Sequence, residues 1–191
     1  MTPDLRWPLP DHLDLRERLV TAWSSDRGYH DLQHLEEVLA RLTELGAGDD
    51  VEVVLAAWFH DAVYDDAGNN EERSALLATE ELSGIRSVDA DEVARLVRLT
   101  ERHRPEPGDR AGEVLCDADL AILAAPADRY ATYVAGVRRE YAAVPDDDFR
   151  RGRAAILRDL LDKPTLFHTA YAREHWEPTA RANLAAELTG P

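Results

Sequence analysis

Residues 51–61 have the sequence VEVVLAAWFHD, an apolar run that ends on a histidine and an aspartate. The run is far shorter than the ~20 apolar residues that a membrane span needs, so we expect a helix buried in a protein core. Its predicted N-cap is Asp49 or Asp50, and the helix is expected to run towards Tyr64. This places His60 and Asp61 near the C-terminal end of a buried element.

The segment before this run is predicted to be a second helix, because its apolar residues recur at the spacing of one helical face. These residues are Leu35, Val38, Leu39, Leu42 and Leu45. His30 and His34 lie four residues apart at its start, so we expect both to project to the same side. Gly46 and Gly48 supply a stop after it.

The remainder of the chain also has helical patterns. Runs of β-branched residues with period-two alternation and Asn-Gly turns are missing, so we expect no sheet. The sequence predicts an all-α fold in one domain over residues 1–191, with C-terminal helices in 126–188 packed onto a part that contains residues 30–119. The further expected helices cover residues 71–83, 93–100, 114–125, 130–144, 147–161 and 171–188.

The composition excludes several classes of protein. The chain has 22 basic and 38 acidic residues, a net charge of −16, which disfavours a nucleic-acid partner. No basic segment leads into an apolar stretch at the start, and the lone Cys116 cannot form an internal disulfide. We therefore expect a cytoplasmic protein without a membrane partner; a homo-oligomer is possible. An anionic substrate would need local positive charge, most simply from a metal ion.

A third apolar segment, VLCDADLAIL at residues 114–123, contains Asp117 and Asp119. Carboxylates in such a segment are costly to bury unless a cation pairs with them. Imidazole and carboxylate without thiolate form a ligand set for Mn, Fe, Co, Ni, Zn or Mg rather than for a structural zinc finger. The sequence thus indicates a divalent metal site.

The order of these polar residues resembles the H…HD…D signature of the HD superfamily of metal-dependent phosphohydrolases, which are all-α proteins. The motif HDLQH (30–34) is similar to the first motif of that superfamily, WFHDAVYD (58–65) to the second, and DAD (117–119) to the last. The wider pattern resembles a bacterial subgroup of predicted HD phosphohydrolases of undefined substrate. Matches to this subgroup occur at NEERSA (70–75), TERH (100–103), GR (152–153) and ARANL (180–184).

This resemblance implies that His34, His60, Asp61 and one acid of the 117/119 pair hold a single divalent ion. We favour Asp119, with Asp117 as the alternative, because related sequences place the ligand in an Ala-Asp pair that leads into apolar residues. Residues two apart on a helix point away from each other, so we do not expect both acids to reach one ion. The implied activity is hydrolysis of a phosphate ester or anhydride of a small molecule, such as a nucleotide, by metal-activated water. Whether a second metal binds is left open.

Asp65 is the leading candidate for the carboxylate that orients or deprotonates the water, because it follows Asp61 by four residues and would share its helical face. It resembles the Asp of the Glu-Asp pair in guanosine-tetraphosphate hydrolases of the superfamily. Tyr64 stands where that Glu would be, and Glu71 or Glu72 could compensate. The other reading of these two glutamates is a capping or solvent-facing role.

Further candidates for contact with substrate, or for support of the ligands, are His30, His103, Arg27, Arg73, Arg153 and Lys163. A second hypothesis is a non-catalytic helical module that keeps the metal for ligand binding or sensing. Tyr64 in place of Glu favours that hypothesis, whereas the presence of Asp65 and Glu71 opposes it.

Overall fold

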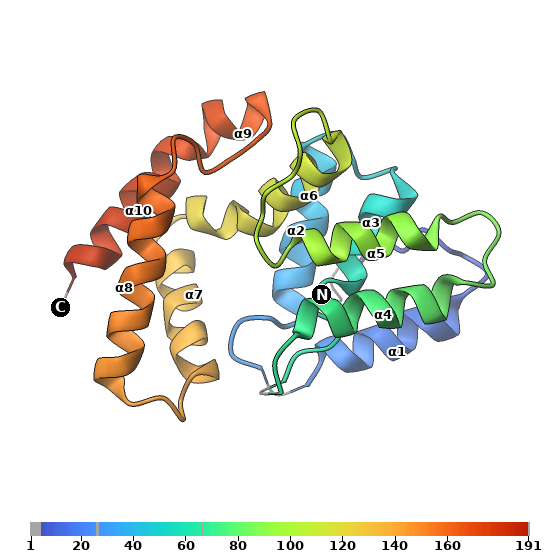
Figure 1. The fold of residues 1–191 in the computed structure, drawn as a ribbon, viewed down its shortest axis with the longest axis horizontal. Helices are drawn as coiled ribbons and strands as arrows, with labels where there is room; N and C mark the ends of the chain where they lie inside the picture. The colour runs from blue at the N-terminus through green and yellow to red at the C-terminus, as the bar shows by residue number, and fades with distance from the viewer. Residues whose placement is uncertain (1–4, 26, 66, 191) are drawn as a thin grey trace. The chain divides into compact units, whose positions relative to one another are not determined.

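The computed structural model describes residues 5–25, 27–65 and 67–190. Over these residues it contains ten α-helices, one short 3₁₀ helix and no strand (Figure 1). The prediction of an all-α fold is therefore confirmed for the described part of the chain. None of the helices described is both long and apolar enough to cross a lipid bilayer.

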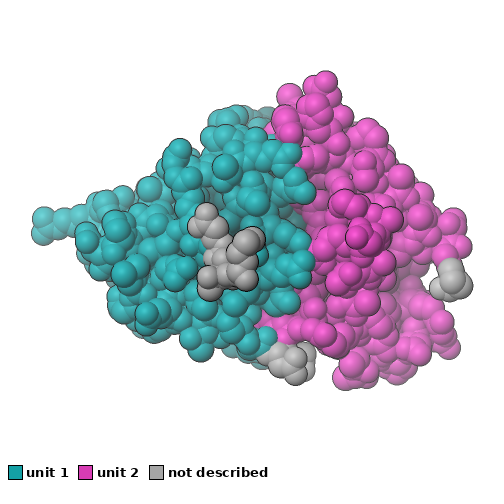
Figure 2. Space-filling view, turned by 180° about the vertical axis from the view of Figure 1, so that it is seen from behind, with its two compact units in different colours: residues 1–26, 30–119 teal, residues 27–29, 120–191 magenta. Residues whose placement is uncertain are grey.

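The chain divides into two compact units, which Figure 2 shows in different colours. Unit 1 comprises residues 1–26 and 30–119, and unit 2 comprises residues 27–29 and 120–191. The predicted arrangement of a single domain stays a prediction, and each unit is described by itself.

Unit 1 is built around α3, whose residues 53–59 are each at most 2% exposed. Helix α3 contacts α2, α4 and α5, while α4 packs along α5 and α1 contacts α2. The apolar run of residues 51–59 is thus the centre of this unit. The helices are α1 (Leu13–Trp23), α2 (Leu32–Glu44), α3 (Val51–Phe59), α4 (Asn70–Leu82), α5 (Ala90–Leu99) and α6 (Arg110–Leu120), the last residue of α6 belonging to unit 2.

Side-chain caps set the starts of α2 and α3. Asp31 Oδ1 accepts hydrogen bonds from the backbone N–H groups of Gln33 and His34, at 2.9 and 3.3 Å. Asp50 Oδ1 accepts from Val53 N at 3.2 Å, so Asp50 rather than Asp49 is the cap of α3. Such caps satisfy N–H groups that the first helical turn leaves without partners. They fix the residue at which each helix begins.

The expectation that the helix of residues 51–61 continues to Tyr64 is wrong. Helix α3 ends at Phe59, and residues 60–62 form a turn. The turn is held from α4, because the buried Ser74 Oγ accepts a hydrogen bond from Val63 N at 3.0 Å. As a result Asp61 and Asp65 do not share a helical face.

Other helix boundaries also differ from the predictions. Helix α1 was not expected. Residues 171–188 form two helices rather than one, and residues 121–124 form a 3₁₀ helix after α6. The remaining expected helices overlap those observed.

Two tryptophans connect α1 and α3 in the core of unit 1. Trp23, which is fully buried, donates from Nε1 to Trp58 O at 2.9 Å. Its ring centroid lies 5.3 Å from that of His60 and 6.1 Å from that of His34. Helix α1 therefore provides the apolar backing for both histidines.

Unit 2 is centred on α10, which contacts the 3₁₀ helix, α8 and α9. Residues 27–29 pack on α7, where Glu140 Oε1 accepts from Gly28 N and Tyr29 N at 3.1 and 2.7 Å. A Cβ at Gly28 would lie 2.1 Å from Gly136 O, so this approach requires glycine. The elements are η1 (Ala121–Ala124), α7 (Ala127–Glu140), α8 (Asp146–Asp162), α9 (Ala170–His175) and α10 (Glu177–Thr189).

Truncation of the core of α3 should be far more costly than truncation of an exposed leucine. Leu55 is 0% exposed and Leu76 on α4 is 55% exposed. Leu55→Ala should lower the free energy of unfolding by about 2–5 kcal/mol, and Leu76→Ala by less than about 0.5 kcal/mol. Urea unfolding followed by circular dichroism measures both; equal losses would contradict the core assignment.

Candidate metal centre

Three segments of unit 1 bring two imidazoles and a carboxylate together. His34 lies in the first turn of α2, His60 is the C-cap of α3, and Asp61 follows it in the turn. His34 Nε2 and His60 Nε2 are 3.2 Å apart, and His60 Nε2 is 3.2 Å from Asp61 Oδ2. The distance from His34 Nε2 to Asp61 Oδ2 is 3.9 Å. All three residues are buried.

A fourth group reaches the same point from α6. Asp119 Oδ1 is 3.1 Å from His34 Nε2 and 3.6 Å from His60 Nε2. The alternative acid, Asp117, is fully buried two residues earlier on the same helix. The carboxylate of Asp119 thus lies close to both imidazoles, as does that of Asp61.

A backbone hydrogen bond sets the orientation of the His60 ring. His60 Nδ1 lies 2.7 Å from Ala57 O, which can only accept. Nδ1 therefore carries the hydrogen, and Nε2 faces the cluster. A hydrogen bond of this kind is the usual support of a metal-bound histidine, since it fixes both tautomer and ring orientation.

The spacing of these donor atoms fits a divalent cation. Two ligands each about 2.1 Å from one ion lie about 3.0 Å apart at right angles and about 3.4 Å apart in a tetrahedron. The observed separations of 3.1–3.9 Å lie near these values. The buried group of His34, His60 and Asp61 can thus hold a metal ion, whose identity the donors do not determine.

His103 forms a hydrogen bond with Asp119 Oδ2, the carboxylate oxygen that does not face His34. His103 Nε2 lies 2.9 Å from Asp119 Oδ2, so the two oxygens of this carboxylate face different histidines. His103 follows the end of α5 and has a positive φ of 50°, which is uncommon for a residue other than glycine. Its backbone N–H donates to Leu99 O at 2.9 Å, which supports this conformation. His103 therefore orients the carboxylate of Asp119.

The charges of the cluster shift its pKa values in opposite directions. Burial lowers the pKa of His34. Burial would also lower the pKa of His60, but Asp61 and Asp119 outweigh it and raise that pKa to about 9. The pKa values of Asp61 and Asp119 are lowered: burial acts against this, and the positive charge of His60 exceeds it. Without a metal, one proton on His60 thus supplies the positive charge that the two carboxylates require.

An aromatic stack lies next to the cluster. The rings of His30 and Tyr64 are stacked at a centroid distance of 4.5 Å, and the His30 ring meets that of His34 edge-on at 5.6 Å. His30 precedes the cap residue Asp31 and therefore lies outside α2. The expected proximity of His30 to His34 is present, although a loop rather than a helical face produces it.

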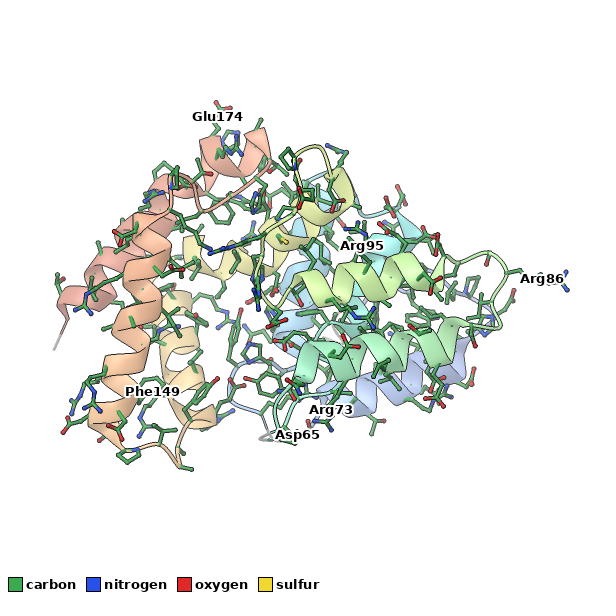
Figure 3. The ribbon with its side chains drawn as sticks, viewed as in Figure 1. Asp65, Arg73, Arg86, Arg95, Phe149 and Glu174 are labelled. Atoms are coloured by element: carbon green, nitrogen blue, oxygen red, sulfur yellow. The ribbon has the colours of Figure 1, made fainter. Side chains whose placement is uncertain are left out.

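Asp65 forms an ion pair that the sequence analysis did not anticipate. Arg73 Nη1 and Nη2 donate to its two carboxylate oxygens at 2.6 and 2.9 Å, and Figure 3 shows the two side chains together. The bond from Arg73 lowers the pKa of Asp65 to about 2. Asp65 is 48% exposed in its side chain. In this structure Asp65, the candidate base, and Arg73, the candidate phosphate contact, are therefore paired with each other.

The other predicted residues are placed as follows. Glu71 is in the first turn of α4, and the neighbouring Glu72 binds Arg98 at 2.6 and 2.9 Å. The remaining candidates belong to unit 2, and their relation to the metal centre stays a prediction. They are Arg27, which is buried, Arg153, which binds Glu187, and Lys163, the C-cap of α8.

Sequence reasoning missed two residues that support the centre, Trp23 and Ser74. Trp23 continues the four-residue spacing of Leu15 and Leu19, so the helical pattern could have identified it. Ser74 carries no comparable signal, because its hydroxyl acts on a turn eleven residues earlier in the chain.

Loss of one ligand should empty the site. Wild-type protein is expected to retain roughly one divalent ion per chain after desalting. His60→Ala and Asp61→Ala should each lose the ion, because each variant removes one of the four proposed ligands. His175→Ala, on α9, is the control and should keep the metal. Elemental analysis measures the content. Equal metal in all four proteins would show that the ligands lie elsewhere.

Metal affinity should rise with pH. His60 must lose its proton to bind the ion, and its pKa is about 9. Since Asp61 and Asp119 have lowered pKa values, they are already ionised at neutral pH. The association constant for Mn²⁺ should thus increase about tenfold per pH unit from about pH 6 to 8 and level off near 9. Competition with a chromophoric chelator measures it, and a flat profile would exclude His60 Nε2 as a ligand.

Comparison of the chain with protein-family models, with curated proteins and with solved structures finds no match in any of the three.

Proposed function

We propose that the chain is a metal-dependent phosphohydrolase of the HD type, which hydrolyses a phosphate ester or anhydride of a small molecule, with a nucleotide as the expected class. The observation that carries the proposal is the buried meeting of His34 Nε2, His60 Nε2 and Asp61 Oδ2. Asp119 is proposed as the fourth ligand because its Oδ1 is 3.1 Å from His34 Nε2. The ion is one of Mn, Fe, Co, Ni, Zn or Mg.

When bound, a divalent ion would supply a water of lowered pKa and would neutralise charge on a phosphate oxygen. The four ligand side chains contribute two imidazoles and two carboxylates, which leaves the ion able to bind water and substrate. Ala57 O keeps His60 Nε2 directed towards the donors of His34 and Asp61, which would hold the ion, and His103 holds Asp119 through its other oxygen. These two contacts keep the donors in place before any substrate arrives.

His30, Tyr64 and Asp65 are the residues proposed to meet the substrate. The stack of His30 and Tyr64 is partly exposed and lies beside His34, so it can contact a group bound at the centre. Asp65 is the proposed proton acceptor, and its carboxylate is bound by Arg73. A substrate phosphate that took over Arg73 would release Asp65 for this role, because guanidinium binds phosphate and carboxylate in the same bidentate way.

The second candidate function is a non-catalytic metal-containing module for ligand binding or sensing. The observation that favours it is the ion pair of Asp65 with Arg73, together with Tyr64 where a catalytic Glu would stand. A carboxylate with a pKa of about 2 is a weak base. The two functions share the metal ligands and differ in what Asp65 does.

A phosphate-release screen separates the two functions. Metal-loaded protein is assayed with nucleotides and sugar phosphates in the presence of Mn²⁺, Co²⁺, Ni²⁺ or Mg²⁺. With a substrate found, Asp65→Asn should lower kcat by about 10²–10⁴-fold without loss of metal, since it removes a proton acceptor. Asp14→Asn is the control, because Asp14 is an exposed acid of unit 1 that pairs with Arg18.

Each outcome of this screen has a defined meaning. Full activity of Asp65→Asn would remove Asp65 from the mechanism while leaving the hydrolase proposal intact. Absence of phosphate release from every compound by protein that contains metal would overturn the hydrolase proposal in favour of the binding module.

A further inference from the structure

Unit 2 contains a cavity between α7, α8 and α10. Its volume is about 480 Å³, within the range typical of small-molecule sites. Figure 3 labels Phe149, which lies on α8 in its wall. The apolar part of the wall also includes Val134, Leu157 and Leu188. The charged part consists of two acids and three arginines, Arg138, Arg150 and Arg153.

Two of the three arginines are committed to other groups. Arg153 binds Glu187 through Nε and Nη2, at 2.7 and 3.1 Å, and the side chains of both are only 13% exposed. Arg138 donates to Tyr141 O at 2.6 Å and to Asp146 at 2.5 Å. Glu187 thus neutralises the charge of Arg153. Arg138 holds the turn between α7 and α8.

Arg150 is the arginine of the cavity that has donors to spare. The one hydrogen bond of its side chain among the described residues is from Nη2 to Asp147 Oδ1, at 2.8 Å. Its side chain is 68% exposed and that of Asp147 is 83% exposed, so water screens this pair and it holds weakly. Nε and Nη1 can therefore bind an anion at the cavity.

The charge of the chain is divided unevenly between the units. Unit 1 has 11 basic and 28 acidic residues, a net charge of −17, whereas unit 2 has 11 basic and 10 acidic residues, a net charge of +1. Taken by itself, unit 2 thus has no net negative charge that would repel an anion. This small positive surplus is opposite in sign to the anionic group that Arg150 would bind.

We propose that this cavity binds a small amphiphilic anion. Arg150 pairs with its carboxylate or phosphate head, and its apolar body lies against Val134, Leu157 and Leu188. The mixed wall matches such a ligand, because a bare inorganic anion would leave the apolar part unfilled, and a neutral hydrocarbon would leave Nε and Nη1 of Arg150 unused. The proposal is independent of the metal centre and of the proposed hydrolysis.

The probe is decanoate, and its binding is followed by isothermal titration calorimetry on the full chain. Arg150→Ala is compared with Arg151→Ala, a matched control. Arg151 lies on the same helix, forms the same kind of pair with Asp148 three residues earlier, and is absent from the cavity wall. Decanoate should bind Arg150→Ala at least about tenfold more weakly than wild type, and Arg151→Ala as tightly as wild type.

Inorganic phosphate and 1-decanol test the head and the tail separately, and each should bind much more weakly than decanoate. The same titration on His60→Ala excludes a carboxylate bound at the metal centre, and there the affinity should be unchanged. Absence of saturable binding to wild type would overturn the proposal. Equal affinity of the two arginine variants, or phosphate that binds as tightly as decanoate, would overturn it as well.

Discussion

Two carboxylates and two imidazoles meet inside unit 1, at the end of the buried helix α3 around which that unit is built. Asp61 and Asp119 would be costly to bury alone, because an unpaired charge in a protein interior loses its hydration. The start of α2, the end of α3 and the end of α6 each deliver one part of the cluster. The ring of Trp23 packs against the rings of His34 and His60 and forms an apolar side of the cluster. The two carboxylates require a positive charge beside them, which either a protonated His60 or a metal ion can supply.

The sequence predicted the parts of this centre that depend on local patterns. Helix α2 follows from its apolar spacing, and α3 from an apolar run capped by Asp50. His60 and Asp61 stood out because they end such a run and lie, in the order of the chain, between a histidine that opens an amphipathic helix and an aspartate in a third apolar segment. The choice between Asp117 and Asp119 depends on how α6 is rotated, which neighbouring helices decide. In the structure the carboxylate of Asp119 reaches the imidazoles, while Asp117 is buried two residues earlier.

The parts that could not be predicted depend on contacts between distant residues. Nothing in residues 60–63 breaks a helix as glycine or proline would, so the pattern extended α3 to Tyr64. The chain turns instead at His60, and Ser74 holds the turn through Val63 N. That difference removes the helical spacing from which Asp65 was inferred. The bond of Asp65 to Arg73 likewise joins residues eight apart across a loop, a distance that no periodic pattern encodes.

The charge of unit 1 determines how an anionic substrate could reach the centre. Counter-ions screen exposed charges beyond about 8–10 Å, so the distant acids of unit 1 have little effect on a phosphate at the centre. The charged groups nearest the centre decide whether the phosphate binds. Those groups are Asp61 and Asp119, both ionised, and His60, which is protonated when no metal is bound, so two negative charges stand against one positive charge. Arg73 is held by Asp65. Without a metal ion the phosphate would therefore face carboxylates. Under the proposed function the ion would therefore have to bind before the substrate, and His34, His60 and Asp61 can form its site without any contribution from the substrate.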